Sequence, residues 1–207
     1  MVATIGKLIF VFISGAWHTA DTFGHLRSLM AEHESEAIAS PSVSPPNPTR
    51  GVRPVNGLHL DIKHAKAAIQ ALVDKRRQVV VITHSYGGAV GACAGKLGAL
   101  MRSKDDNGYV CTSNECTVFY SDLSPEEQQK RIVLLKPQPM LSSTEPTLYE
   151  PRHDIPFMYL FCDNDLGFPL AAQEALAKSQ PGKVIEGLRL PLDVGREQSR
   201  IAGLGRL

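Results

Sequence analysis

A run of β-branched residues that leads into a serine constrains the fold of this chain more than any other feature. The run and the residues after it read Val79-Val80-Val81-Ile82-Thr83-His84-Ser85-Tyr86-Gly87-Gly88. The apolar part predicts a buried strand, and the glycines permit a sharp turn into a helix that presents the Ser85 hydroxyl. Such a turn requires small neighbours, which Gly87 supplies and Thr83 does not. We interpret the segment as a nucleophile elbow, with an ordinary buried strand ending in a Ser-Gly turn as the alternative.

Other apolar runs predict further strands of the same sheet. The runs at Leu8–Ile13 and Phe157–Phe161 are continuous, which is typical of parallel strands covered on both faces. The weaker run at Val184–Leu190 suits an edge strand. Helices are expected at residues 62–73, 89–101, 125–135 and 171–178, the third of them behind a Ser124-Pro125-Glu126-Glu127 capping box. This alternation predicts a doubly wound, mostly parallel α/β sheet that folds as a single domain over residues 1–207.

Composition argues against several classes of partner. The net charge of +1 gives no basic surface, so we expect no nucleic acid partner. No apolar run approaches the length of a membrane span. Leu8–Ile13 follows a single basic residue and precedes no cleavage site, so a strand explains it better than a secretion signal. The cysteines show no metal-ligand spacing, and we expect reduced thiols in a cytoplasmic protein rather than a Cys111–Cys116 disulfide. The sequence leaves the oligomeric state open.

The loop after the first strand is a candidate for stabilising negative charge. It reads Ser14-Gly15-Ala16-Trp17-His18. Beside a nucleophile elbow, a glycine-containing turn of this kind can aim backbone N–H groups at a developing oxyanion. The two donors would be the N–H groups of Ala16 and Tyr86. The alternative is a plain strand-to-helix loop whose Trp17 packs against the core.

An acidic segment follows the third apolar run directly. It reads Cys162-Asp163-Asn164-Asp165-Leu166-Gly167-Phe168-Pro169. Catalytic groups in open α/β sheets gather beyond the carboxyl ends of the strands. A carboxylate there can orient an imidazole, and Asp165 is the candidate, with Asp163 as its local competitor. The alternative is that these acids serve helix capping and turn formation.

These segments together resemble the α/β-hydrolase superfamily, in the branch that contains small esterases, methylesterases and hydroxynitrile lyases. Ser14–Trp17 is similar to the oxyanion segment of that branch, His84–Gly88 to its elbow, and Asp165 ahead of Pro169 to its acid. The stretch from Phe119 resembles the entrance to a small helical lid, which would span residues 119–153. The similarity runs from about Lys7 to about Lys178.

The resemblance implies the α/β-hydrolase fold and an esterase-type acyl transfer to water. It implies Ser85 as nucleophile, Asp165 as the acid, and no metal or organic cofactor. The apolar side chains available at residues 119–150 suit a small hydrophobic ester or lactone as substrate. Core packing would use the same side chains.

Three departures from the family pattern bear on activity. The oxyanion-loop histidine of the family is Ser14 here. The family has a core strand between the elbow helix and the lid, whereas Tyr109–Cys111 is too short to supply it. The family's general-base histidine follows the last strand, where this chain has Arg196, and no histidine occurs after His153. A guanidinium keeps its charge and cannot take the serine proton.

One histidine is a candidate substitute base. His18 follows the oxyanion segment, although a loop histidine bonded to nearby backbone is the alternative. The elbow is expected to point His84 away from Ser85, and His153 precedes a strand and so belongs to the opposite end of the sheet. Besides a serine hydrolase, the chain therefore suits a catalytically degenerate relative that binds a small molecule or partner, a lyase or cyclisation catalyst, or a misread coding sequence at its C-terminal end.

Overall fold

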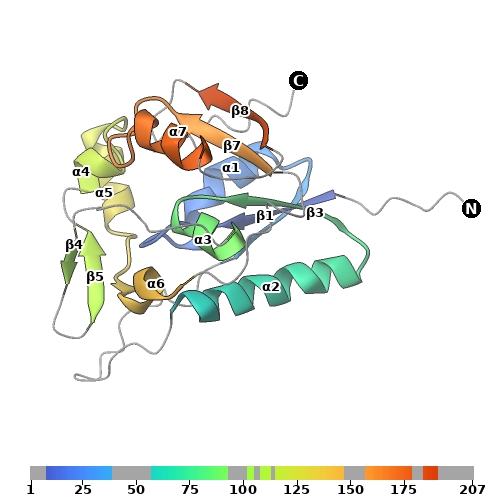
Figure 1. Cartoon of the computed structure of the whole chain (residues 1–207). Helices are drawn as coiled ribbons and strands as arrows, with labels where there is room; N and C mark the ends of the chain where they lie inside the picture. Colours follow the sequence, from blue (N-terminus) through green and yellow to red (C-terminus); the bar gives the residue numbers. More distant parts are fainter. Residues whose placement is uncertain are drawn as a thin grey trace, which may run out of the picture.

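A three-stranded parallel sheet forms the centre of the protein in the computed structural model (Figure 1). The model describes residues 8–38, 57–92, 102–104, 108–112, 115–146, 157–178 and 184–190. The sheet has the order β2-β1-β3, with β1 at Leu8–Ile13, β2 at Glu34–Ile38 and β3 at Gln78–Thr83. In its register Ile9 lies beside Val79 and Ile13 beside Thr83. The two apolar runs that predicted central strands are therefore paired with each other.

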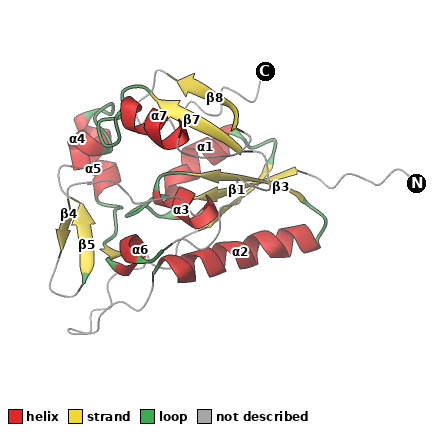
Figure 2. Cartoon of the chain, in the orientation of Figure 1, coloured by secondary structure: helices red, strands yellow, loops and turns green. Residues whose placement is uncertain are grey.

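Two smaller sheets accompany the central one (Figure 2). β7 (Phe157–Cys162) and β8 (Val184–Leu190) pair in parallel, so both predicted strands form. In the described residues they pair with each other and not with the central sheet, to which the sequence assigned them. β4 (Arg102–Lys104), β5 (Tyr109–Thr112) and β6 (Gln138–Pro139) form an antiparallel sheet that the sequence did not predict.

The outer edge of β3 lacks a neighbouring strand in the described structure. There β3 pairs only with β1, and Val80 and Val81 are 40% and 38% exposed. Tyr109–Cys111, which the sequence judges too short for a core strand, lies in the antiparallel β5. Within the described residues, the core strand expected between elbow and lid is thus missing, as the sequence predicts.

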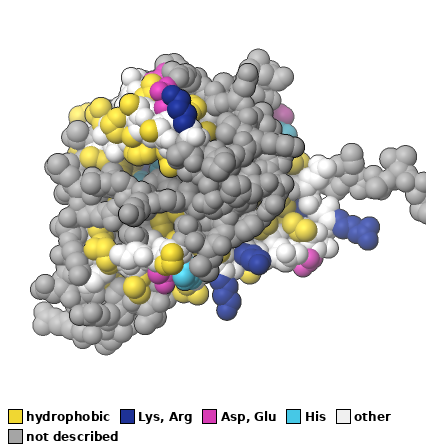
Figure 3. Space-filling view, in the orientation of Figure 1, with side chains coloured by type: hydrophobic (Ala, Val, Ile, Leu, Met, Phe, Trp, Pro, Cys, Tyr) yellow, Lys and Arg dark blue, Asp and Glu magenta, His cyan; other side chains and the backbone are white. Residues whose placement is uncertain are grey.

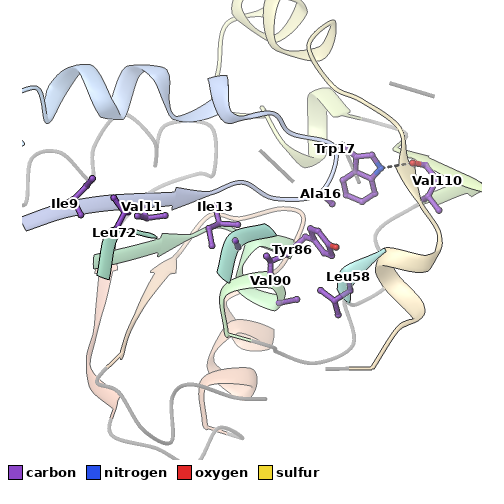
Figure 4. Packing of buried hydrophobic residues seen from close by; sticks show 12 residues of the cluster. Ile9, Val11, Ile13, Ala16, Trp17, Leu58, Leu72, Tyr86, Val90 and Val110 are labelled. Atoms are coloured by element: carbon purple, nitrogen blue, oxygen red, sulfur yellow. Dashed lines mark hydrogen bonds between the residues drawn. The ribbon is translucent and has the colours of Figure 1, made fainter. Parts of the chain in front are cut away.

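Helices cover both faces of the central sheet. One face carries α2 (Leu58–Asp74) and α3 (Tyr86–Ala92), and the other carries the 3-10 helix η1 (Ala20–Phe23) and α1 (Gly24–Leu29). The side chains of β1 divide accordingly: Ile9, Val11 and Ile13 pack towards α2 and α3 (Figure 4), while Phe12 packs on Phe23. This period of two is what a strand buried on both faces produces. It confirms the doubly wound α/β class.

The remaining helices lie after the elbow helix along the chain. They are α4 (Glu115–Val118), α5 (Pro125–Ile132), α6 (Leu141–Thr144) and α7 (Leu170–Lys178). Ser124 caps α5 by accepting a hydrogen bond from the Glu127 N–H at 3.4 Å, so the predicted capping box forms. The predicted helix at 89–101 begins earlier, with α3, and residues 93–101 of it lie outside the described ranges.

Several expectations concern the surface and the termini. Lys and Arg side chains project from the surface along α2 in the space-filling view (Figure 3). None of the helices in the described residues is long and apolar enough to span a bilayer. Cys116 is a free thiol, as expected. The proline-rich stretch at 40–56, the last residues of the predicted lid and the segment around Arg196 lie outside the described residues.

Candidate active site

The turn between β3 and α3 has the strained geometry that the sequence predicts. Ser85 has a φ of 51°, and its side chain is exposed. The turn is closed by hydrogen bonds from the Gly87 N–H to the His84 carbonyl and from the Gly88 N–H to the Ser85 carbonyl, each 2.8 Å long. A positive φ at a non-glycine residue costs about 1–3 kcal/mol and persists only where the surroundings enforce it. Ser85 is thus held by its surroundings in an unfavourable backbone conformation.

Two glycines allow the turn to press against the loop after β1. A Cβ atom at Gly87 would overlap the carbonyl oxygen of Ile13 and lie 2.7 Å from that of Ser14. A Cβ atom at Gly15 would lie 2.9 Å from His84 Nδ1 and 3.2 Å from Ser85 Cβ. The loop with the candidate donor Ala16 and the turn with the candidate donor Tyr86 are therefore in contact.

Trp17 ties this loop to distant segments. It has a φ of 63°, its indole N–H donates to the Val110 carbonyl at 2.9 Å, and its backbone N–H donates to Gln138 Oε1 at 3.2 Å. Its own carbonyl accepts from the Lys136 N–H at 2.8 Å. The indole is buried in the core, as the alternative interpretation of the loop expects. Because the Trp17 N–H is engaged, and no hydrogen bond of the described residues uses the Ala16 N–H, Ala16 is the donor this loop can offer to a ligand.

His18 is buried with both ring nitrogens engaged. Its Nδ1 lies 2.7 Å from the Ala16 carbonyl, and its Nε2 lies 3.0 Å from the Tyr120 hydroxyl. Because a carbonyl only accepts, Nδ1 carries the proton, and Nε2 accepts from Tyr120. Burial lowers the pKa of His18; the Ala16 hydrogen bond opposes this shift and Arg131 adds to it. The neutral ring has one lone pair, and Tyr120 uses it.

His84 lies beside the same loop with an unsatisfied nitrogen. Its Nδ1 is buried and has no hydrogen-bond partner among the described residues. The ring stands edge-on to His18, with 6.0 Å between the ring centroids. Burial, and to a lesser extent the neighbouring His18, lower the pKa of His84 to about 3. Both histidines near the elbow are therefore neutral at neutral pH.

Asp165 is engaged in its own turn. Its Oδ1 accepts hydrogen bonds from the N–H groups of Gly167 and Phe168, both at 2.8 Å. This is the turn role that the sequence offers as the alternative to a catalytic acid. Within the described residues, no hydrogen bond joins Asp165 to His18 or Ser85. The competing Asp163 has a buried Oδ1 for which the described residues provide no partner.

Sequence reasoning missed three residues that contact the elbow or the loop after β1, namely Asp61, Tyr120 and Gln138. Asp61 is 1% exposed and accepts a hydrogen bond of 2.7 Å from the Tyr86 hydroxyl. The predicted helix at 62–73 starts one residue after Asp61, whereas α2 starts at Leu58; the signal available was an acid four positions before Ala65, in line with the apolar face. Tyr120 and Gln138 left no local signal, because their partners Nε2 of His18 and the N–H of Trp17 are more than a hundred residues away.

A small cavity adjoins His18 rather than Ser85. Its volume is about 20 Å³, enough for about one water molecule. Its lining consists of His18, Thr19, Asp21, Thr22, Tyr120, Arg131, Leu134 and Leu135. Ser85 is not among the residues that line this cavity. The structure brings the loop with Gly15 against His84 and Ser85, and His18 lies beside His84.

Comparison with known proteins identifies the family to which this chain is similar. The model of the alpha/beta hydrolase family matches residues 10–113. The alpha/beta hydrolase nvfD of Aspergillus novofumigatus is 24% identical over 223 aligned positions, covering 85% of each chain.

Among solved structures, a methylesterase from Arabidopsis superposes with a TM-score of 0.73 at 17% identity, covering 96% of this chain and 97% of its own. Polyneuridine aldehyde esterase gives 0.71 at 14% identity, with 97% of both chains covered. A pyrethroid hydrolase from Sphingobium faniae gives 0.70 at 16% identity, covering 97% and 96%. At these identities the likeness shows a shared fold.

Proposed function

The chain belongs to the alpha/beta hydrolase family, and on this basis we propose that it is an esterase-type serine hydrolase acting on a small hydrophobic ester or lactone. The observation that carries the proposal is the φ of 51° at Ser85, in a turn that presses against the loop containing Ala16. Strain of this kind is retained at functional sites, where it presents a group that relaxed backbone would not expose.

The reaction assigns a role to each of these groups. The Ser85 hydroxyl oxygen attacks the ester carbonyl, and the N–H groups of Ala16 and Tyr86 stabilise the oxyanion that forms. Collapse of this intermediate expels the alcohol, and water then hydrolyses the acyl-enzyme. Asp165 is the candidate acid by family resemblance. Its Oδ1 also accepts hydrogen bonds from the N–H groups of Gly167 and Phe168. The role of catalytic acid therefore competes with the role of this carboxylate in stabilising the turn.

The base for this reaction is proposed to be His18. Its Nε2 can take the Ser85 proton once the Tyr120 hydroxyl turns to another acceptor, because Tyr120 occupies the lone pair in the structure. Lowered by burial, the His18 pKa favours the neutral form that a base requires.

The surroundings of the cavity support a hydrophobic substrate. Val133 and Leu134, just after α5, are 70% and 50% exposed, and Leu134 also lines the cavity. The cavity is too small for an ester, so we propose that the described part of the expected lid, residues 119–146, moves outward to admit substrate. The thiol of Cys116, which forms no disulfide in the structure, supports a cytoplasmic location.

One observation favours a second function, that of a degenerate relative that binds without turning over. Both nitrogens of His18 are engaged, and its lone pair on Nε2 accepts from Tyr120 rather than from Ser85. Such a protein would keep the fold and the pocket but not the chemistry.

Covalent labelling distinguishes the two functions. The purified full chain is treated with a fluorophosphonate probe beside Ser85→Ala and a control, Ser28→Ala, which changes an exposed serine on α1. A hydrolase labels as wild type and as the control but not as Ser85→Ala. Folded wild-type protein that takes up no probe, or labelling that survives Ser85→Ala, would contradict the proposal.

A further inference from the structure

The residue after the nucleophile is anchored by its side chain to a buried carboxyl group. Tyr86 is fully buried among apolar side chains of the core (Figure 4), and its hydroxyl donates to Asp61 Oδ2 at 2.7 Å. Asp61 lies in the first turn of α2, which packs against α3. The hydrogen bond therefore joins the elbow to a different helix.

Burial of the Asp61 carboxyl group costs desolvation free energy. Its neighbours on the buried face of α2 are Leu58, Ala65 and Leu72, and an apolar residue would fill such a site without desolvating a polar group. A short hydrogen bond to a carboxyl oxygen recovers part of that cost and fixes a direction that apolar packing does not. The hydrogen bond to Asp61 thus fixes the position of the Tyr86 hydroxyl group.

The part of α2 that carries Asp61 is itself held in place. The Glu145 carboxylate, which follows α6, accepts the His59 N–H at 3.1 Å, and the Pro146 carbonyl lies 2.8 Å from His59 Nε2. Gly57 leaves the room for this contact, since a Cβ atom there would overlap the Glu145 carboxylate. Asp61 therefore extends from an anchored helix end.

The opposite side of Tyr86 is also constrained. Gly87 fits against the Ser14 carbonyl with no space for a side chain, and Ser85 is strained at φ 51°. Relaxation of that strain would rotate the peptide unit between Ser85 and Tyr86, and with it the Tyr86 N–H. A hydrogen bond at the end of the Tyr86 side chain resists this rotation.

We propose that Asp61 is a positioning residue that holds the Tyr86 N–H in the direction required of an oxyanion donor. The inference rests on the proposed function, because that function makes Tyr86 a donor. Asp61 acts through Tyr86 and does not touch the reacting atoms.

Kinetics of ester hydrolysis test the inference in the full chain, with p-nitrophenyl butyrate as the probe substrate. Tyr86→Phe and Asp61→Leu remove the hydrogen bond, whereas Asp61→Asn keeps an acceptor oxygen. The control is Asp74→Asn, at the other end of α2, whose carboxylate is exposed and bonded to Gln70. We expect kcat to fall about tenfold or more in Tyr86→Phe and Asp61→Leu with KM unchanged, since loss of a whole oxyanion donor costs about 10²–10³-fold.

Two further comparisons separate positioning from general support of the fold. Asp61→Asn should recover most of kcat, and Asp74→Asn should match wild type. The double variant Asp61→Leu/Tyr86→Phe should be no slower than the slower of the two single variants, because the Tyr86–Asp61 hydrogen bond is already lost in each. Unchanged kcat in folded Tyr86→Phe would overturn the inference, and so would a KM increase without a kcat decrease. If Asp61→Leu does not fold, Tyr86→Phe against Asp61→Asn decides alone.

A second readout does not depend on activity. Hydrogen exchange of the Tyr86 amide is followed by NMR in the ¹⁵N-labelled chain and in Tyr86→Phe. Faster exchange at Tyr86, with the amides of β1 unchanged, supports positioning even if wild type proves inactive. In that case only the esterase proposal fails. Equal exchange in the two proteins overturns the positioning role whatever the activity.

Discussion

Replacement of Gly87 by alanine tests the packing that creates the elbow. The added Cβ atom would overlap the Ile13 carbonyl oxygen and lie 2.7 Å from that of Ser14, and both obstacles are backbone atoms of β1 and its loop. Side chains cannot rotate away to relieve such a contact, so α3 must move off the sheet. Overpacking of this kind typically costs about 1–3 kcal/mol. For a chain of this size, each kcal/mol shifts Tm by about 2–4 °C, which predicts a fall of about 2–12 °C.

The neighbouring glycine supplies a matched control. A Cβ atom at Gly88 would meet nothing closer than Thr83 Oγ1 at 3.7 Å, an ordinary contact. Since alanine is the better helix former, Gly88→Ala should leave stability unchanged or raise it by up to about 1 kcal/mol. Thermal and urea unfolding followed by circular dichroism measure both variants. A Gly87→Ala protein as stable as Gly88→Ala would refute the close approach of the elbow to β1.

Further predictions concern the strained serine and the two buried histidines. Ser85→Gly should abolish probe labelling yet stabilise the fold by about 1 kcal/mol in urea unfolding, because glycine adopts a positive φ without strain; a loss of stability would contradict it. His84 has a pKa of about 3 when folded and 6.5 ordinarily, so the unfolded chain binds more protons between these values. The free energy of unfolding should therefore be highest above about pH 6.5 and decrease as the pH falls towards 3. In His84→Gln this decrease should be less steep. Tyr120→Phe frees the lone pair of His18, so labelling of Ser85 should become faster and should still be retained below pH 6.5, because burial lowers the His18 pKa. His18→Gln should abolish labelling in either background, and a rate indifferent to both changes would exclude His18 as the base.

The central strands were predictable because each is a run of consecutive apolar residues. β1 is covered on both faces, and its continuous apolar run follows directly from that environment. β3 has the same kind of run at Val79–Ile82, but it is an edge strand in the described structure and Val80 and Val81 are partly exposed, so the expectation of a fully buried strand there was wrong. β2 was missed because Glu34 and Ser35 are polar. Its strand conformation comes from pairing with β1 rather than from its own sequence pattern.

The candidate site divides along a similar line. The elbow was predictable because its requirements are local: a strand, a serine and a glycine two residues later. The state of the base was not, because the lone pair of His18 is occupied by Tyr120, a contact between residues 102 positions apart. Asp165 shows the same limit, since a turn-forming acid and a catalytic acid have one sequence pattern, and its described bonds run to Gly167 and Phe168. Local rules thus locate the candidate nucleophile Ser85, and tertiary contacts decide whether a base can activate it.

Mapping of the modified residue tests the central claim most directly. The full chain is incubated with a fluorophosphonate, and the adduct is located by intact-mass measurement and by sequencing of its peptides. Our account predicts one adduct per chain, on Ser85. No adduct on folded protein, or an adduct on any other residue, would contradict the claim that the strained turn after β3 presents a reactive serine.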